Sequence, residues 1–119
     1  MTHPVLTRRR AQRAHRLDLA RAWAEKVGPA LGAQGIVVVG SVARGDFNKW
    51  SDLDVLVVAA DLPDTLAARL ALVARRPPGL EAILWTPSEL AERRSRATDP
   101  AATEAYERGV VVYGELPSS

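Results

Sequence analysis

Residues 37–58 read VVVGSVARGDFNKWSDLDVLVV, and this stretch decides the fold of the chain. An apolar run ends at Gly40 and Ser41, a mostly polar loop follows, and a second apolar run starts behind two aspartates. Both runs are short and rich in β-branched residues, a composition typical of fully buried strands. They predict one strand at 36–39 and another at 53–59.

Two aspartates stand at the mouth of the second predicted strand. Asp52 and Asp54 are two residues apart, and strand residues at that spacing point to the same face. Two neighbouring carboxylates repel each other, so one stays protonated unless a cation lies between them. Mg²⁺ prefers hard oxygen ligands, and two-metal phosphoryl-transfer sites hold their ions about 3.5–4 Å apart. The pair therefore indicates a divalent-metal site, and the alternative is a strand end with two solvated acids.

The end of the first predicted strand has the features of a phosphate site. Gly40 and Ser41 lead into a predicted helical turn at 41–45. Such a turn exposes backbone N–H groups and a hydroxyl to a phosphate, and glycine permits close approach. An ordinary tight turn with a serine cap is the alternative. A phosphate-binding backbone and a carboxylate pair on adjacent strands together describe a nucleoside triphosphate site.

The rest of the chain predicts further strands and helices. Asp61 is the expected cap of a helix, and Thr86 with Glu89 forms a capping box before another. Strands separated by helices predict an α/β or α+β fold, with a sheet covered mainly on one side. In order, we expect a helix at 7–27, strands at 36–39 and 53–59, a helix at 61–76, a strand at 80–85, helices at 86–96 and 100–108, and a last strand or packed tail at 109–114.

Length and composition narrow the class of protein. A chain of 119 residues, 47% of them apolar, is typical of one folded domain. The chain has no cysteine, which excludes disulfides and thiolate metal sites and fits a cytoplasmic protein. It has no apolar run of 18 residues, so we expect no membrane-spanning helix.

Charge is distributed unevenly along the chain. Residues 1–26 hold seven Lys and Arg against two acidic residues, and the remainder holds nine against twelve. A basic helix beside an acidic body can contact nucleic acid weakly, or an acidic partner. The alternative is a solvated helix face rich in arginine.

The sequence GSVARGDFNKWSDLDVLV, residues 40–57, resembles the signature of the nucleotidyltransferase superfamily related to DNA polymerase β, in its minimal (MNT) form. The close match covers about a sixth of the chain, and the order of elements extends the resemblance to most of residues 17–116. The resemblance implies a small mixed β-sheet flanked by helices. It also implies one minimal domain over 1–119, with a basic helix at 1–27 and a catalytic core at 36–116.

The resemblance further implies Mg²⁺-dependent transfer of a nucleoside monophosphate from a triphosphate, with ATP as the expected donor, to a hydroxyl group. By position, Gly40 and Ser41 match the residues that hold the β- and γ-phosphates. Asp52 and Asp54 match the residues that hold two metal ions. A third acid on the neighbouring strand also binds metal and activates the attacking hydroxyl, and Glu81 falls at that place.

At the position of Glu81 the family more often has Asp, and the alternative is that Glu81 is an exposed residue at the start of a strand.

Three further residues belong to the predicted site or its loop. Arg44 is expected to neutralise charge on the leaving pyrophosphate. Ser51 either caps the loop or supports a carboxylate at the nucleotide site. Trp50 is expected to anchor the loop to the core, with stacking on a base as the alternative.

A minimal domain has no second domain to hold the acceptor, so we expect a protein acceptor or a partner subunit. The chain resembles the antitoxin half of HEPN/MNT toxin–antitoxin pairs, which implies AMP transfer to a tyrosine of a HEPN toxin. Arg8–Arg10 are then a candidate docking surface. Two alternatives stay open: a non-catalytic antitoxin that binds and masks its partner, and a small-molecule nucleotidyltransferase acting as a homodimer.

Overall fold

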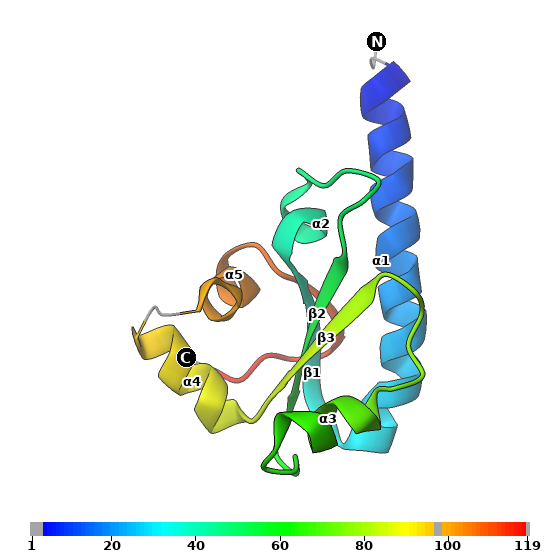
Figure 1. Cartoon of the computed structure of the whole chain (residues 1–119). Helices are drawn as coiled ribbons and strands as arrows, with labels where there is room; N and C mark the ends of the chain where they lie inside the picture. Colours follow the sequence, from blue (N-terminus) through cyan, green and yellow to red (C-terminus); the bar gives the residue numbers. More distant parts are fainter. Residues whose placement is uncertain (1–3, 97–98, 119) are drawn as a thin grey trace.

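A mixed four-stranded sheet forms the centre of the molecule, with helices on both sides of it (Figure 1). The computed structural model describes residues 4–96 and 99–118. The elements in chain order are α1 (Pro4–Leu31), β1 (Ala33–Val39), α2 (Gly40–Arg44), β2 (Leu53–Ala59), α3 (Leu66–Leu72), β3 (Leu80–Trp85), α4 (Pro87–Arg96), α5 (Pro100–Glu107) and β4 (Val110–Gly114). β1 pairs antiparallel with β2 and β4, while β2 and β3 are parallel, in the order β3-β2-β1-β4. The predicted mixed sheet flanked by helices is confirmed.

Both faces of the sheet are buried. On one face, α1 covers a core that includes Trp23, Val38 and Val55. On the other face, α4 and α5 cover a second core that includes Val39 and Leu56. The expectation of a sheet covered mainly on one side is wrong, because β1 and β2 are apolar at nearly every position instead of alternating apolar with polar residues.

Helix α1 continues through Gly28 and Pro29, where the sequence predicted its end. A Cβ atom on Gly28 would lie 2.6 Å from the ring of Tyr113, so the glycine lets β4 pack directly against the helix. Val27 and Leu31 pack against the same core, and this tertiary contact outweighs the weak local propensity. The N-terminal part of α1 projects past the sheet (Figure 1). No helix in the described part of the chain is apolar over a sufficient length to cross a membrane.

Helix α3 begins later and ends earlier than predicted. Asp61 is not its cap; instead, Thr65 Oγ1 accepts a hydrogen bond from the Ala68 N–H at 3.1 Å. The proline two residues after Asp61 disfavours helical backbone at the residue between them. Arg76, expected in the last turn, lies beyond the helix and donates a hydrogen bond to the Leu80 carbonyl at 2.9 Å. The loops around α3 are therefore longer than expected, and Arg76 supports the start of β3.

The predicted capping box at the start of α4 is confirmed. The Thr86 N–H donates to Glu89 Oε1 at 2.8 Å, and the Glu89 N–H donates to Thr86 Oγ1 at 3.2 Å. Arg69 of α3 also pairs with Glu89 Oε1 at 2.7 Å. Burial by itself would raise the pKa of Glu89, but the hydrogen bonds with Thr86 and the pair with Arg69 outweigh it and lower this pKa.

Replacing Glu89 with alanine is expected to lower the free energy of unfolding at pH 7 by about 1 kcal/mol, the usual size of a lost cap. Because folding lowers the pKa of Glu89, its contribution is present above the ordinary glutamate pKa and is lost as the pH falls through the folded value. Urea unfolding at pH 7 and pH 3.5 measures this. Glu92→Ala, which removes an exposed pair with Arg96, is the control with little effect. An equal cost of Glu89→Ala at both pH values would contradict the prediction.

Candidate functional site

The strand register brings the predicted residues to one end of the sheet. Asp54 of β2 lies opposite Val39 of β1 and opposite Glu81 of β3. Gly40 follows Val39 directly and opens α2. Three neighbouring strands therefore place a glycine turn and two acidic residues side by side, on the face that α4 and α5 cover further along.

The turn after β1 lies directly against the carboxylate of Asp54. Gly40 has a φ of 75°, and a Cβ atom there would lie 2.7 Å from Asp54 Oδ2. Only glycine leaves room for this approach in a left-handed backbone conformation. The Ser41 carbonyl accepts the Gly45 N–H at 2.8 Å, which closes the single turn of α2. The expected helical turn is thus present, and Ser41 lies beside Gly40 at its start.

Negative charge is concentrated around Asp54. Burial raises the pKa of Asp54, and the neighbouring charges of Asp52, Glu81 and Glu104 raise it further, while Arg44 acts in the opposite direction. A half-buried carboxylate among three other acids is stabilised by a bound cation.

The donor set fits a hard divalent cation, since Asp52, Asp54 and Glu81 offer only carboxylate oxygens. Among residues 4–96 and 99–118, however, no three acidic or histidine side chains are already close enough to hold a metal ion. The side chain of Glu81 is 56% exposed and lies 3.7 Å from Arg76. Glu81 would have to turn from Arg76 toward Asp54 to complete the predicted set of three acids.

Glu104 of α5 is a member of the site that the sequence did not indicate. The Gly40 N–H donates to Glu104 Oε2 at 2.9 Å, and Arg44 Nη1 pairs with Glu104 Oε1 at 2.7 Å. Arg44 also pairs with Asp46 at 3.2 Å. Helical spacing alone does not distinguish Glu104 from Glu107 three residues later, because only the packing of α5 against β1 brings Glu104 to Gly40.

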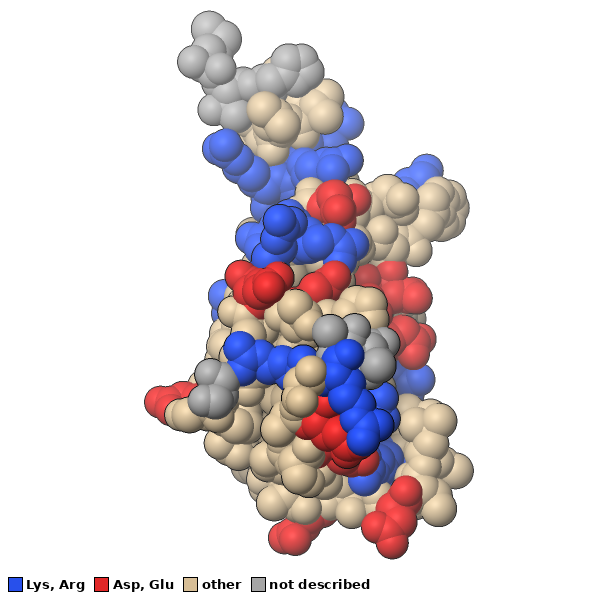
Figure 2. Space-filling model, turned by 90° about the vertical axis from the view of Figure 1, so that its left-hand side faces the viewer, with Lys and Arg blue, Asp and Glu red and all other residues tan. Residues whose placement is uncertain are grey.

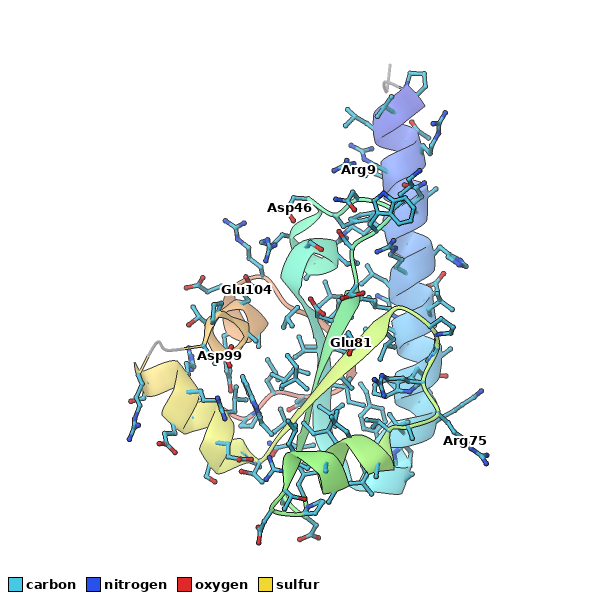
Figure 3. All side chains as sticks on the ribbon, viewed as in Figure 1. Arg9, Asp46, Arg75, Glu81, Asp99 and Glu104 are labelled. Atoms are coloured by element: carbon cyan, nitrogen blue, oxygen red, sulfur yellow. The ribbon has the colours of Figure 1, made fainter. Side chains whose placement is uncertain are left out.

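Arginines of α1 hold the turn that carries Gly40. Arg13 donates to the carbonyls of Val42 and Ala43, each at 2.9 Å. Arg9 donates to the Gly45 carbonyl at 3.4 Å and lies next to this segment in Figure 3. These bonds satisfy carbonyls at the C-terminal end of α2, which have no helical partner. For Arg13 a solvated face is the wrong interpretation, since its guanidinium binds two backbone carbonyls, while Arg9 stays exposed.

The loop before β2 is held in a similar way. Arg16 donates to the Ser51 carbonyl at 2.7 Å, and its guanidinium lies 5.0 Å from the centre of the Phe47 ring. Ser51 Oγ accepts the Asn48 N–H at 3.0 Å, so Ser51 caps the loop, the first of its two predicted roles. The loop therefore enters β2 from a position that α1 determines.

Trp50 does not anchor this loop to the core, contrary to expectation. Its side chain is 80% exposed, and Lys49 Nζ lies 4.9 Å from the centre of its ring. The expectation was wrong because Phe47, buried under Arg16, already anchors the loop. Trp50 instead borders a cleft of about 300 Å³ whose lining includes Asp52.

Comparison with known proteins shows the family of the chain. The sequence profile of a family described as a nucleotidyltransferase domain matches residues 18–108. The chain therefore belongs to the nucleotidyltransferase-domain family, and the resemblance carried by residues 40–57 is confirmed. No curated protein has a significantly similar sequence.

Several solved structures share the fold. A candidate nucleotidyltransferase from Sulfolobus solfataricus has a TM-score of 0.67 and 20% identity, covering 90% of this chain and 87% of that one. A toxin–antitoxin complex with AMP-PNP has a TM-score of 0.56 and 20% identity, and a mutant of the MntA–HpeT toxin–antitoxin has 0.54 and 18%. In both, the match covers 80% of this chain and 73% of the other. At these identities the similarity establishes the fold alone.

Proposed function

We propose that the protein is a Mg²⁺-dependent nucleotidyltransferase that moves AMP from ATP to a hydroxyl of a partner protein, a tyrosine of a HEPN-type toxin. The observation that carries the proposal is the strand register, which sets Asp54 beside Glu81 and beside the end of β1, where Gly40 follows directly. Membership of the nucleotidyltransferase-domain family supports the reaction type. We further propose that residues 1–119 act as one minimal cytoplasmic domain, with the catalytic core at 36–116.

In this proposal the chain holds the leaving part of the triphosphate and the metal ions. The Gly40 N–H, Ser41 and Arg44 bind the β- and γ-phosphates. Asp52 and Asp54, together with Glu81, would hold two Mg²⁺ ions, which when bound neutralise charge on the phosphates.

The transfer step itself needs a hydroxyl placed opposite the leaving pyrophosphate. The acceptor oxygen forms a bond to the α-phosphorus while the bond from that phosphorus to the bridging oxygen of the β-phosphate breaks. Glu81 takes the proton of the acceptor hydroxyl, and pyrophosphate leaves with its charge neutralised by Arg44.

The partner proposal rests on fold and charge. Two of the structures with the same fold are toxin–antitoxin structures. Arg8–Arg10 are exposed on the projecting part of α1, and Figure 2 shows Lys and Arg side chains gathered there. Such a surface attracts an acidic partner. We propose that it docks the toxin, with contact to nucleic acid at most weak.

Labelling with α-³²P ATP tests the proposed function. The purified protein is incubated with Mg²⁺ and the product of the neighbouring gene, and Asp52→Asn is compared with Glu92→Gln, a change on exposed α4. We expect label on the partner with the wild type and with Glu92→Gln, and none with Asp52→Asn. Arg8→Glu/Arg10→Glu, which leaves the contact of Arg9 with the Gly45 carbonyl in place, should lose the partner without losing nucleotide binding.

A second candidate function is favoured by the position of Glu81, whose exposed side chain pairs with Arg76 and is not turned toward Asp54. In that case the protein binds and masks its partner without catalysis. No label on any protein, with the partner still bound, would replace the first proposal with this one. Label on a small molecule in the absence of a partner would instead favour a small-molecule nucleotidyltransferase acting as a homodimer.

A further inference from the structure

We propose that Glu104 is an internal phosphate mimic that sets the nucleotide affinity of the site. Its carboxylate occupies, in the free protein, the donors that the proposed function assigns to the triphosphate, and it must leave them when nucleotide binds. The inference rests on that proposed function and adds to it a residue from an element outside the predicted signature.

The contacts of Glu104 are those of a bound anion. One carboxylate oxygen accepts the N–H of Gly40 at 2.9 Å, and the other pairs with Arg44 Nη1 at 2.7 Å. Both oxygens are thus engaged, by one backbone donor and one guanidinium, as two oxygens of a phosphate group would be. The single N–H of Gly40 cannot serve Glu104 and a phosphate at the same time, and the Arg44 N–H groups bound to Glu104 and Asp46 have to be released before they can donate to a phosphate. Nucleotide and Glu104 are therefore competitors for Gly40 and Arg44.

Electrostatics make the competition stronger. Glu104 is close enough to Asp54 to contribute to the raised pKa of that carboxyl, together with Asp52 and Glu81. A triphosphate arriving here meets the charge of Glu104 as well as those of the metal-binding acids. Releasing Glu104 from the site reduces this repulsion, so the protein binds nucleotide only at the cost of breaking an internal ion pair.

Glu104 can leave without moving the backbone of α5. Ala102 and Ala105 on the same helix are buried against β1 and β2, which holds the helix in place. The side chain of Glu104 itself is 25% exposed, so it borders solvent on one side. Rotation about its side-chain bonds is sufficient to free Gly40 and Arg44, and such rotations are fast compared with helix movement.

Glu104→Gln and Glu104→Ala test the proposal, with Glu107→Gln as a control of the same charge change on the exposed side of α5. Isothermal titration calorimetry measures the affinities for Mg²⁺-AMP-PNP, inorganic tripolyphosphate and adenosine. We expect both Glu104 variants to bind the two phosphate ligands on the order of tenfold more tightly than wild type, since one charge-assisted pair no longer has to be broken. Adenosine affinity, which involves no phosphate, should not change, and Glu107→Gln should behave as wild type.

The outcomes separate this inference from the function on which it rests. If wild type binds Mg²⁺-AMP-PNP and the Glu104 variants bind it no more tightly, the mimic is excluded and the nucleotide site stands. If those variants bind it more weakly, Glu104 is a ligand of the metal or the nucleotide and the proposal is overturned. A gain for adenosine equal to that for tripolyphosphate would show a loosened site and would also overturn it. If neither the wild type nor any variant binds nucleotide, the proposed function fails together with the inference. Circular dichroism of each variant establishes that the fold is retained.

Discussion

Replacing Asp54 with asparagine is expected to abolish nucleotide transfer and to stabilise the metal-free protein. Transfer should fall by about 10³-fold or more, because the charge stabilisation that a bound metal supplies amounts to several kcal/mol. The fold should gain stability at pH 7, because burial and the nearby Asp52, Glu81 and Glu104 raise the pKa of Asp54. A carboxyl whose pKa is raised by folding destabilises the folded state at pH values above that pKa. Asparagine removes this cost while keeping the shape of the side chain.

Thermal unfolding in the presence of EDTA measures the effect on stability. We expect a higher Tm for Asp54→Asn than for wild type at pH 7, and a smaller difference as the pH falls through the folded pKa, where the wild-type carboxyl takes up its proton. Asp52→Asn is the matched control. Asp52 is exposed, so this variant should lose transfer with a smaller rise in Tm. A lower Tm for Asp54→Asn would show that the Asp54 carboxylate stabilises the metal-free fold and would contradict the prediction.

Replacing Gly40 with alanine is expected to remove most nucleotide binding and transfer. The new Cβ atom would lie 2.7 Å from Asp54 Oδ2, so the carboxylate has to move. A displacement of this kind is expected to cost about 10²-fold in transfer, since misplacement by about 1 Å has that effect on a reacting geometry. Alanine at the positive φ of this position also adds backbone strain of about 1–2 kcal/mol to the folded state.

Gly45→Ala separates the two effects of this substitution. Gly45 also has a positive φ, of 89°, but a Cβ atom there would meet nothing within 4 Å. In urea unfolding both variants should therefore lose a similar amount of stability through backbone strain, while only Gly40→Ala loses affinity for Mg²⁺-AMP-PNP. Equal nucleotide affinities in the two variants would show that the contact between Gly40 and Asp54 does not matter for binding.

Local patterns in the sequence predicted the elements that depend on local interactions. The apolar runs predicted β2 and β3 at their observed bounds, and Thr86 with Glu89 predicted the start of α4, because capping joins residues only three apart. The alternation of a strand also placed Leu53 and Asp54 on opposite faces, one buried under α1 and the other at the site. Helix ends were less predictable, since the end of α1 depends on Tyr113, which lies far along the chain.

By itself, the sequence determined the family, the bounds of β2 and β3, and the local order of Gly40, Ser41, Asp52 and Asp54 within one short signature. Tertiary structure alone decided what surrounds that signature. Glu104 reaches Gly40 across 64 residues, and Arg13 reaches Val42 across 29. Such contacts depend on how helices pack against the two faces of the sheet, and no spacing in the sequence encodes that packing directly. The charges that balance the site are therefore a property of the fold.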